Sequence, residues 1–106
     1  MFDYSVVDKV VKAIVDDVNP RMIVIFGSAA KRTARKDSDL DIMVVMDTDR
    51  GFGHRNFPIQ EALHKRRIHV DRDIFVVTPQ EFSEGVDDEY SLVHEAYTTG
   101  VVAYKV

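Results

Sequence analysis

The sequence contains no cysteine and no tryptophan, and no long hydrophobic run. Without cysteine the chain has no disulfide framework, no thiolate zinc site, no iron–sulfur cluster and no cysteine nucleophile. No apolar run approaches the roughly 18 residues that a membrane-spanning helix needs, and the amino-terminal residues lack the basic and then apolar order of a signal peptide. We therefore expect a soluble, cytoplasmic protein that does not act in a membrane.

Positive charge is also in short supply, because 18 acidic residues outweigh 14 basic ones and give a formal net charge of −4. An acidic chain argues against general binding of duplex DNA or RNA, which depends on neutralising phosphates. Hydrophobic residues make up 45% of the sequence and charged residues 30%, which is the balance of a folded globular protein. The length predicts a single domain over residues 1–106.

The hydrophobic pattern alternates between helical and strand periods along the chain. It predicts helices over 5–18, from 58 to about 66, from about 79, and over 88–99, and strands over 22–26, 40–46, 70–77 and 101–104. Residues 29–38 are a connection or a short helix, and the composition of residues 47–56 indicates a mobile loop. Thr78 to Glu81 form a capping box, and Gly100 is the expected carboxyl-terminal cap of the last helix. This order indicates an α/β (α+β) fold with a small mixed sheet flanked by helices.

Aspartates occupy unusual positions in two of the predicted strands. Asp39 and Asp41 share one face of the strand over 40–46, and Asp71 and Asp73 share one face of the strand over 70–77. A carboxylate in a strand costs free energy unless a cation or a hydrogen-bond donor compensates it. Neighbouring strands would gather three carboxylates, which is the arrangement of a metal-assisted phosphoryl or nucleotidyl transfer site. The simpler alternative is that these aspartates only begin strands or turns at the sheet edge.

A second feature follows the strand over 22–26. Gly27 and Ser28 come directly after it, so backbone N–H groups and the Ser28 hydroxyl can face a phosphate without an intervening Cβ atom. Lys31 and Arg32 supply positive charge nearby. A glycine and a serine after a strand are also a common turn, and the spacing of a Walker loop is absent from the sequence.

The two features occur in a fixed order that resembles the minimal nucleotidyltransferase family, within the DNA polymerase β-like superfamily. The resemblance covers nearly the whole chain and lies in four segments: Val24–Ser28, Asp37–Ile42, Val76–Phe82 and Val93–Tyr104. It implies a polymerase β-like palm in which Asp39 and Asp41 bind two Mg²⁺ ions and Asp73 completes the catalytic one. Gly27, Ser28 and Lys31 would hold the triphosphate of the nucleotide. Counting back from Thr78 favours Asp73 as the third carboxylate, with Asp71 kept in reserve.

The resemblance also implies a reaction and a partner. The expected enzyme is a nucleotidyltransferase that moves a nucleoside monophosphate, with ATP or another nucleoside triphosphate as donor, to a hydroxyl on a protein. Family members of this size pair with a small helical HEPN-domain protein and act as antitoxins by adenylylating the toxin. A homodimer is also possible, and Tyr90, Tyr97 and Tyr104 are candidates for a subunit interface.

Two departures and two alternatives accompany this interpretation. The strand that carries Asp71 and Asp73 is more polar than in the family, so Arg72 between them is expected to point to solvent or to a partner. Family members usually carry an arginine and a glycine where this chain has Lys31 and Arg32, and a residue other than glycine resists a positive φ. The first alternative is a non-catalytic antitoxin or scaffold that neutralises its partner by contact alone. The second is a metal-dependent nuclease or phosphohydrolase, which uses similar carboxylates but gives Gly27 and Ser28 no triphosphate to hold.

Overall fold

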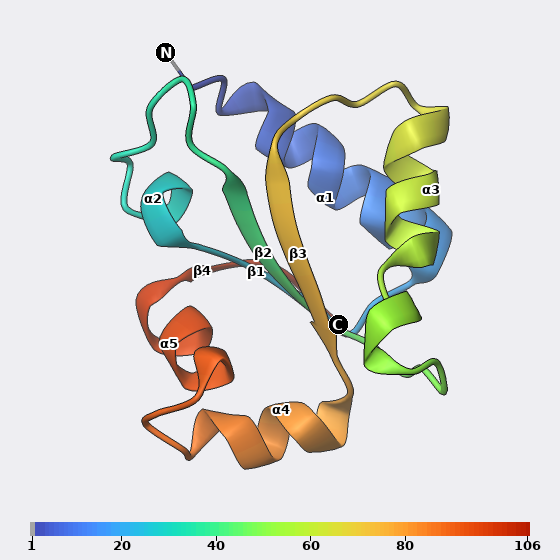
Figure 1. Ribbon diagram of the computed structural model, residues 1–106, viewed down its shortest axis with the longest axis vertical. Coiled ribbons are helices and arrows are strands. Elements are labelled where there is room, and N and C mark those ends of the chain that lie inside the picture. The colour runs from blue at the N-terminus through green and yellow to red at the C-terminus, as the bar shows by residue number, and fades with distance from the viewer. Residues whose placement is uncertain (1) are drawn as a thin grey trace.

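The computed structural model describes residues 2–106, and Figure 1 shows their path. The elements follow in the order α1 (Ser5–Val18), β1 (Met22–Phe26), α2 (Gly27–Ala30), β2 (Leu40–Val45), the 3₁₀ turn η1 (Phe52–His54), α3 (Phe57–Lys65), β3 (Arg72–Val77), α4 (Pro79–Val86), α5 (Leu92–Thr99) and β4 (Val101–Lys105). No helix among these is long and apolar enough to cross a membrane.

The four strands form one mixed sheet in the order β3-β2-β1-β4. β1 runs antiparallel to both β2 and β4, whereas β2 and β3 run parallel. Two parallel neighbours need a crossover connection, and α3 lies between them in the sequence and provides it. The expected small mixed sheet flanked by helices is confirmed, and it is an α+β arrangement.

Both faces of the sheet are covered, which explains why its strands read as continuous apolar runs. On one face, Ile23, Ile42 and Ile74 of the sheet belong to one buried cluster. The helices α1 and α3 cover this face and contribute Ile14 and Leu63 to the same cluster. On the other face, Val24 and Met43 pack with residues of α5. Figure 1 shows α1 and α3 together on one side of the sheet, and α4 and α5 on the other.

A buried arginine fastens the chain between β2 and α3, where the composition had indicated a mobile loop. Arg55 donates to the Val76 carbonyl oxygen at 3.3 Å and pairs with Glu81 across 2.6 Å. Asn56 Nδ2 lies 3.5 Å from the Ile74 carbonyl oxygen, also on β3. These side chains satisfy backbone carbonyls along the outer edge of β3, so this edge is not left open for pairing with another strand.

Two boundaries differ from the sequence prediction by two residues or more. The last helix begins at Leu92 and not at Asp88, because Ser91 is its N-cap and accepts a hydrogen bond from His94 N at 3.0 Å. Asp88 instead accepts from Tyr90 N at 3.1 Å in the preceding turn. The third strand begins at Arg72, two residues later than predicted, and the Arg72 guanidinium binds Gln60 Oε1 at 2.9 Å instead of pointing to solvent.

Candidate functional site

The sheet register places Asp41 beside Asp73. These two residues are direct partners in the parallel pair of β2 and β3, so their side chains leave the same face of the sheet. Phe26, the last residue of β1, is the partner of Asp41 on its other side. Asp39 lies one residue before β2, on the same face by parity. The structure thus brings together the ends of three strands that are far apart in the sequence.

Asp41 is partly buried, whereas Asp39 and Asp73 are exposed. Burial raises the pKa of the Asp41 carboxyl above its usual value, and the neighbouring carboxylates of Asp73 and Asp39 raise it further. Like charges at this spacing repel one another unless a cation lies among them. The same repulsion is therefore a reason to expect a cation here.

Gly27 allows Asp41 to occupy its place. Gly27 has a φ of +70°, a conformation that side chains rarely adopt, and a Cβ atom at this position would overlap Asp41 Oδ2. Two independent demands therefore select glycine: the left-handed backbone and the close approach of the carboxylate. The sequence signal, a glycine after a buried strand, had suggested phosphate access. The structure adds that the same glycine makes room for a candidate metal ligand.

Ser28 lies in α2, the single helical turn that begins at Gly27, and Lys31 is the C-cap of that turn. Ser28 is partly buried, and its hydroxyl has no hydrogen-bond partner among residues 2–106, while its carbonyl oxygen accepts from Thr33 N at 2.9 Å. Lys31 N donates to the Gly27 carbonyl oxygen at 3.2 Å and its side chain is exposed. The Ser28 hydroxyl is thus available next to Gly27, the residue that Asp41 approaches, and the Lys31 ammonium is exposed at the end of the same turn.

Arg32, which stands where the family usually has glycine, keeps the backbone that glycine would favour. Its φ is +59°, and its guanidinium stacks on the Tyr4 ring with 4.5 Å between the guanidinium carbon and the ring centroid. A cation–π contact at an exposed site is worth about 0.5–1 kcal/mol, which offsets much of the strain of a left-handed residue. Position 32 thus has a left-handed backbone although it is occupied by arginine.

The carboxylates fit a divalent cation in chemistry but are not gathered as a finished site. Carboxylate oxygens are the ligands that Mg²⁺ prefers, and Asp39, Asp41 and Asp73 supply them from one face. Across residues 2–106, however, no three His, Asp or Glu side chains lie close enough together to hold a metal ion as they stand. Side-chain rotation of the exposed Asp39 and Asp73 toward Asp41 is what a bound cation would require.

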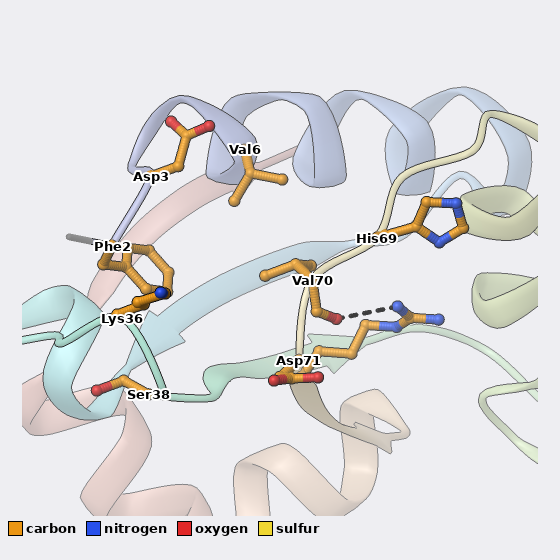
Figure 2. Close-up of a pocket in the computed structure, with 9 residues that line it drawn as sticks. Phe2, Asp3, Val6, Lys36, Ser38, His69, Val70 and Asp71 are labelled. Carbon is orange, nitrogen blue, oxygen red and sulfur yellow. Dashed lines mark hydrogen bonds between the residues drawn. The ribbon is translucent and has the colours of Figure 1, made fainter.

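Asp71, the reserve candidate, lies elsewhere. Its carbonyl oxygen accepts from Leu40 N at 2.8 Å, and its side chain lines a hollow of about 520 Å³ together with Lys36, Ser38 and His69. Figure 2 shows this hollow between the amino-terminal segment, the chain before β2 and the chain before β3. Neither Asp41 nor Gly27 lines it. Register therefore favours Asp73 over Asp71 as the neighbour of Asp41.

Two aromatic residues beside the carboxylates were missed by sequence reasoning. Phe26 and Phe75 meet edge to face, with 5.7 Å between ring centroids, and both are partly buried. Phe75 follows Asp73 by two residues and so shares its face, a parity that the sequence already contained. The two rings form an apolar floor next to the carboxylates, on the side toward α4 and α5.

Comparisons with known proteins agree with this geometry. Residues 8–104 match the family model described as Polymerase beta, Nucleotidyltransferase. A search of curated proteins found no match. Among solved structures, the chain is similar to a candidate nucleotidyltransferase from Sulfolobus solfataricus, with 20% identity over 96% of this chain and 76% of that one and a TM-score of 0.55.

A second similar structure is described as a toxin–antitoxin with AMP-PNP. It is 17% identical, over 99% of this chain and 75% of that one, with a TM-score of 0.59. At these identities the two structures show a shared fold, whereas the family match covers most of the sequence. The chain belongs to the polymerase β nucleotidyltransferase family.

Proposed function

We propose that the chain is an Mg²⁺-dependent nucleotidyltransferase that transfers AMP from ATP to a hydroxyl group on a partner protein. The observation that carries this proposal is the placement of Asp41 against Gly27 and in register with Asp73. A protein that acted only by contact would gain nothing from a partly buried carboxylate whose neighbours repel it. The family match supports nucleotidyl transfer over the nuclease alternative. Nucleotidyl transfer uses a nucleoside triphosphate that Gly27 and Ser28 would bind, whereas a nuclease reaction does not.

In the proposed reaction, the acceptor hydroxyl oxygen attacks the α-phosphorus of ATP. A phosphoester bond forms to the acceptor, the bond between the α-phosphorus and the bridging oxygen breaks, and pyrophosphate leaves. Asp73, exposed at the outer strand, takes the hydroxyl proton. Ser28 and Lys31 bind the phosphates that leave, with Lys31 acting as a point charge without the two-pronged geometry of arginine.

Two Mg²⁺ ions would be held by Asp39 and Asp41, with Asp73 completing the ligands of one of them. When bound, they would stabilise both the attacking and the leaving oxygens. The chain itself holds the Asp41 carboxylate in place against Gly27. The exposed side chains of Asp39 and Asp73 would then turn toward a cation bound to Asp41.

The acceptor is proposed to lie on a separate molecule, a HEPN-domain toxin in the manner of the family that the sequence resembles. The similar toxin–antitoxin structure supports a protein partner and a nucleotide for that protein, and it motivates the same proposal here. The proposed role of the chain is that of an antitoxin which inactivates its toxin by adenylylation.

The proposal is tested with ATP labelled at the α-phosphate, Mg²⁺, and the protein encoded next to this chain as acceptor. We expect label on the acceptor and an added mass of one AMP, and no label on it when only the γ-phosphate of ATP is labelled. Asp39→Asn and Asp41→Asn should abolish transfer, while Asp37→Asn, an exposed neighbour, should not. Partner neutralisation without any transfer would instead establish the contact-only antitoxin.

A further inference from the structure

Charge is divided unevenly along the chain. Residues 73–104 contain seven acidic residues and neither lysine nor arginine, although the whole sequence has 14 basic residues. This segment runs from β3 through α4 and α5 into β4, and six of its seven acidic residues lie in α4, α5 and the turn between them. The two helices α4 and α5, which lie on one side of the sheet in Figure 1, therefore carry acidic side chains and neither lysine nor arginine.

The same part of the molecule exposes large apolar side chains. Tyr90 is 92% exposed and Leu92 is 50% exposed. The turn that presents them is held at both ends: Ser91 Oγ donates to the Gly85 carbonyl oxygen at 2.6 Å, and His94 Nδ1 lies 2.7 Å from the Val86 carbonyl oxygen. A tyrosine ring that is exposed to solvent on a hydrogen-bonded turn is typical of a residue that anchors a protein interface, because little further ordering is needed on binding.

A hollow of about 530 Å³ lies along the outer side of α5, which we call the α5 hollow. Tyr90 and Leu92 line it together with two carboxylates, Glu89 and Glu95, and with Thr98. An aromatic ring attracts a cation to its face, and adjacent carboxylates bind the same cation by charge-assisted hydrogen bonds. These groups in combination match an arginine or lysine side chain of another molecule.

We propose that the α5 hollow is the docking surface for a protein partner with exposed arginine and lysine side chains. Nucleic acids and anionic membranes are unsuitable occupants, because the six acidic residues of α4, α5 and the turn between them, with no lysine or arginine among them, would repel phosphates. The helix that carries the hollow also packs on the candidate site, since α5 contacts β1, which ends just before Gly27, and α2, which begins with it. Resting on the proposed function, this docked partner is the protein that carries the acceptor hydroxyl.

The test uses a synthetic peptide of alternating Arg-Arg and Gly-Ser pairs, and a second peptide with glutamate in place of arginine. Each is titrated into the isotope-labelled chain at low salt, and amide shifts are followed by NMR. We expect the basic peptide, and not the acidic one, to change the amide chemical shifts of Tyr90, Leu92 and Glu95. Binding should weaken as salt is added, because screening shortens the reach of surface charges.

Matched variants distinguish binding of the basic peptide at the α5 hollow from its general attraction to a negatively charged protein. Glu89→Gln with Glu95→Gln should weaken binding of the basic peptide about 10-fold, through loss of two charge-assisted contacts. Asp8→Asn with Glu61→Gln removes the same charge from exposed sites on α1 and α3 and should leave affinity within about twofold, since distant exposed charges are screened. Tyr90→Ala should also weaken binding, unlike Phe57→Ala, which removes an aromatic ring that is 52% exposed on α3.

Equal losses in the two pairs of variants, or shifts that map to another surface, would overturn the docking proposal. Nucleotide binding and AMP transfer are measured on the same samples, so the two proposals fail separately. Loss of ATP binding and transfer with peptide binding intact contradicts only the proposed function. Intact nucleotide binding with no specific binding at the α5 hollow contradicts only the docking surface.

Discussion

The Asp41 carboxylate lies over Gly27, in the space that a side chain at position 27 would fill. The contact joins the residue that follows β1 to the first residues of its antiparallel neighbour β2, because Asp41 pairs with Phe26, the last residue of β1. A candidate metal ligand and a candidate phosphate-binding turn are thereby built as one unit. A change to either residue is expected to disturb both functions.

Gly27→Ala tests this unit directly. The new Cβ atom would meet the Asp41 carboxylate, and the left-handed backbone would cost about 1–2 kcal/mol of stability on its own. We expect a lower urea midpoint together with loss of Mg²⁺-dependent ATP binding. The control is Gly53→Ala, where a Cβ atom has nothing within 4 Å. If Gly27→Ala binds nucleotide as the wild type does, the proposed site is wrong.

Asp73→Asn and Asp71→Asn distinguish the two candidates for the third carboxylate. Asp73 is the register partner of Asp41, whereas Asp71 lies before the strand and lines a separate hollow. We expect Asp73→Asn to lower AMP transfer at least about 100-fold, as removal of a group that handles the proton does. Asp71→Asn should leave the transfer rate within a few-fold of wild type. The opposite ranking in a steady-state assay would move the third carboxylate to Asp71.

Glu81→Gln tests the pH dependence of stability. Hydrogen bonds from Arg55 and from Thr78 N hold the pKa of Glu81 below its ordinary value. A lowered pKa in the folded state contributes stability that is present above the unfolded value, near 4.5, and is lost as pH falls through the folded pKa. The variant should lose about 1–3 kcal/mol at neutral pH, because it leaves the buried Arg55 without its carboxylate.

The measurement for Glu81 is urea unfolding of both proteins from neutral pH to below pH 4. The difference between wild type and Glu81→Gln should shrink as the solution becomes more acidic. Glu84→Gln serves as the control, since that exposed residue only accepts a hydrogen bond from Gln80. A difference that does not change with pH would show that the Arg55 pair does not contribute through its charge.

Substitutions of Arg32 separate backbone strain from charge. Arg32→Gly relieves a positive φ but removes the stacking on Tyr4, so these opposing effects of about 1 kcal/mol each should leave stability nearly unchanged. Arg32→Ala loses the stacking and keeps the strain, and we expect it to unfold at a lower urea concentration than either of the other two proteins. Equal midpoints for Arg32→Ala and wild type would show that the contact with Tyr4 contributes no stability.

Local pattern was enough to locate most elements of the fold. The helix over Ser5–Val18 and the strand over Met22–Phe26 have the bounds that periodicity predicted. The reason is that the spacing of apolar residues within each segment already shows which face is buried. The capping box of Thr78 and Glu81 is likewise a local interaction and is confirmed. The start of α5 was predicted wrongly, since Asp88 and Ser91 are both good caps and the Ser91 bond to Gly85 decides between them.

The sequence by itself determined the chemical types available: hard-oxygen ligands in strands, a glycine and serine after a buried strand, and no thiol. Only the tertiary structure decided which of them meet. Asp41 and Asp73 are neighbours because a parallel register, set by packing on both faces of the sheet, aligns residues that are 32 positions apart in the sequence. Periodicity reports the face on which a side chain lies, but the order and register of strands depend on contacts between distant segments.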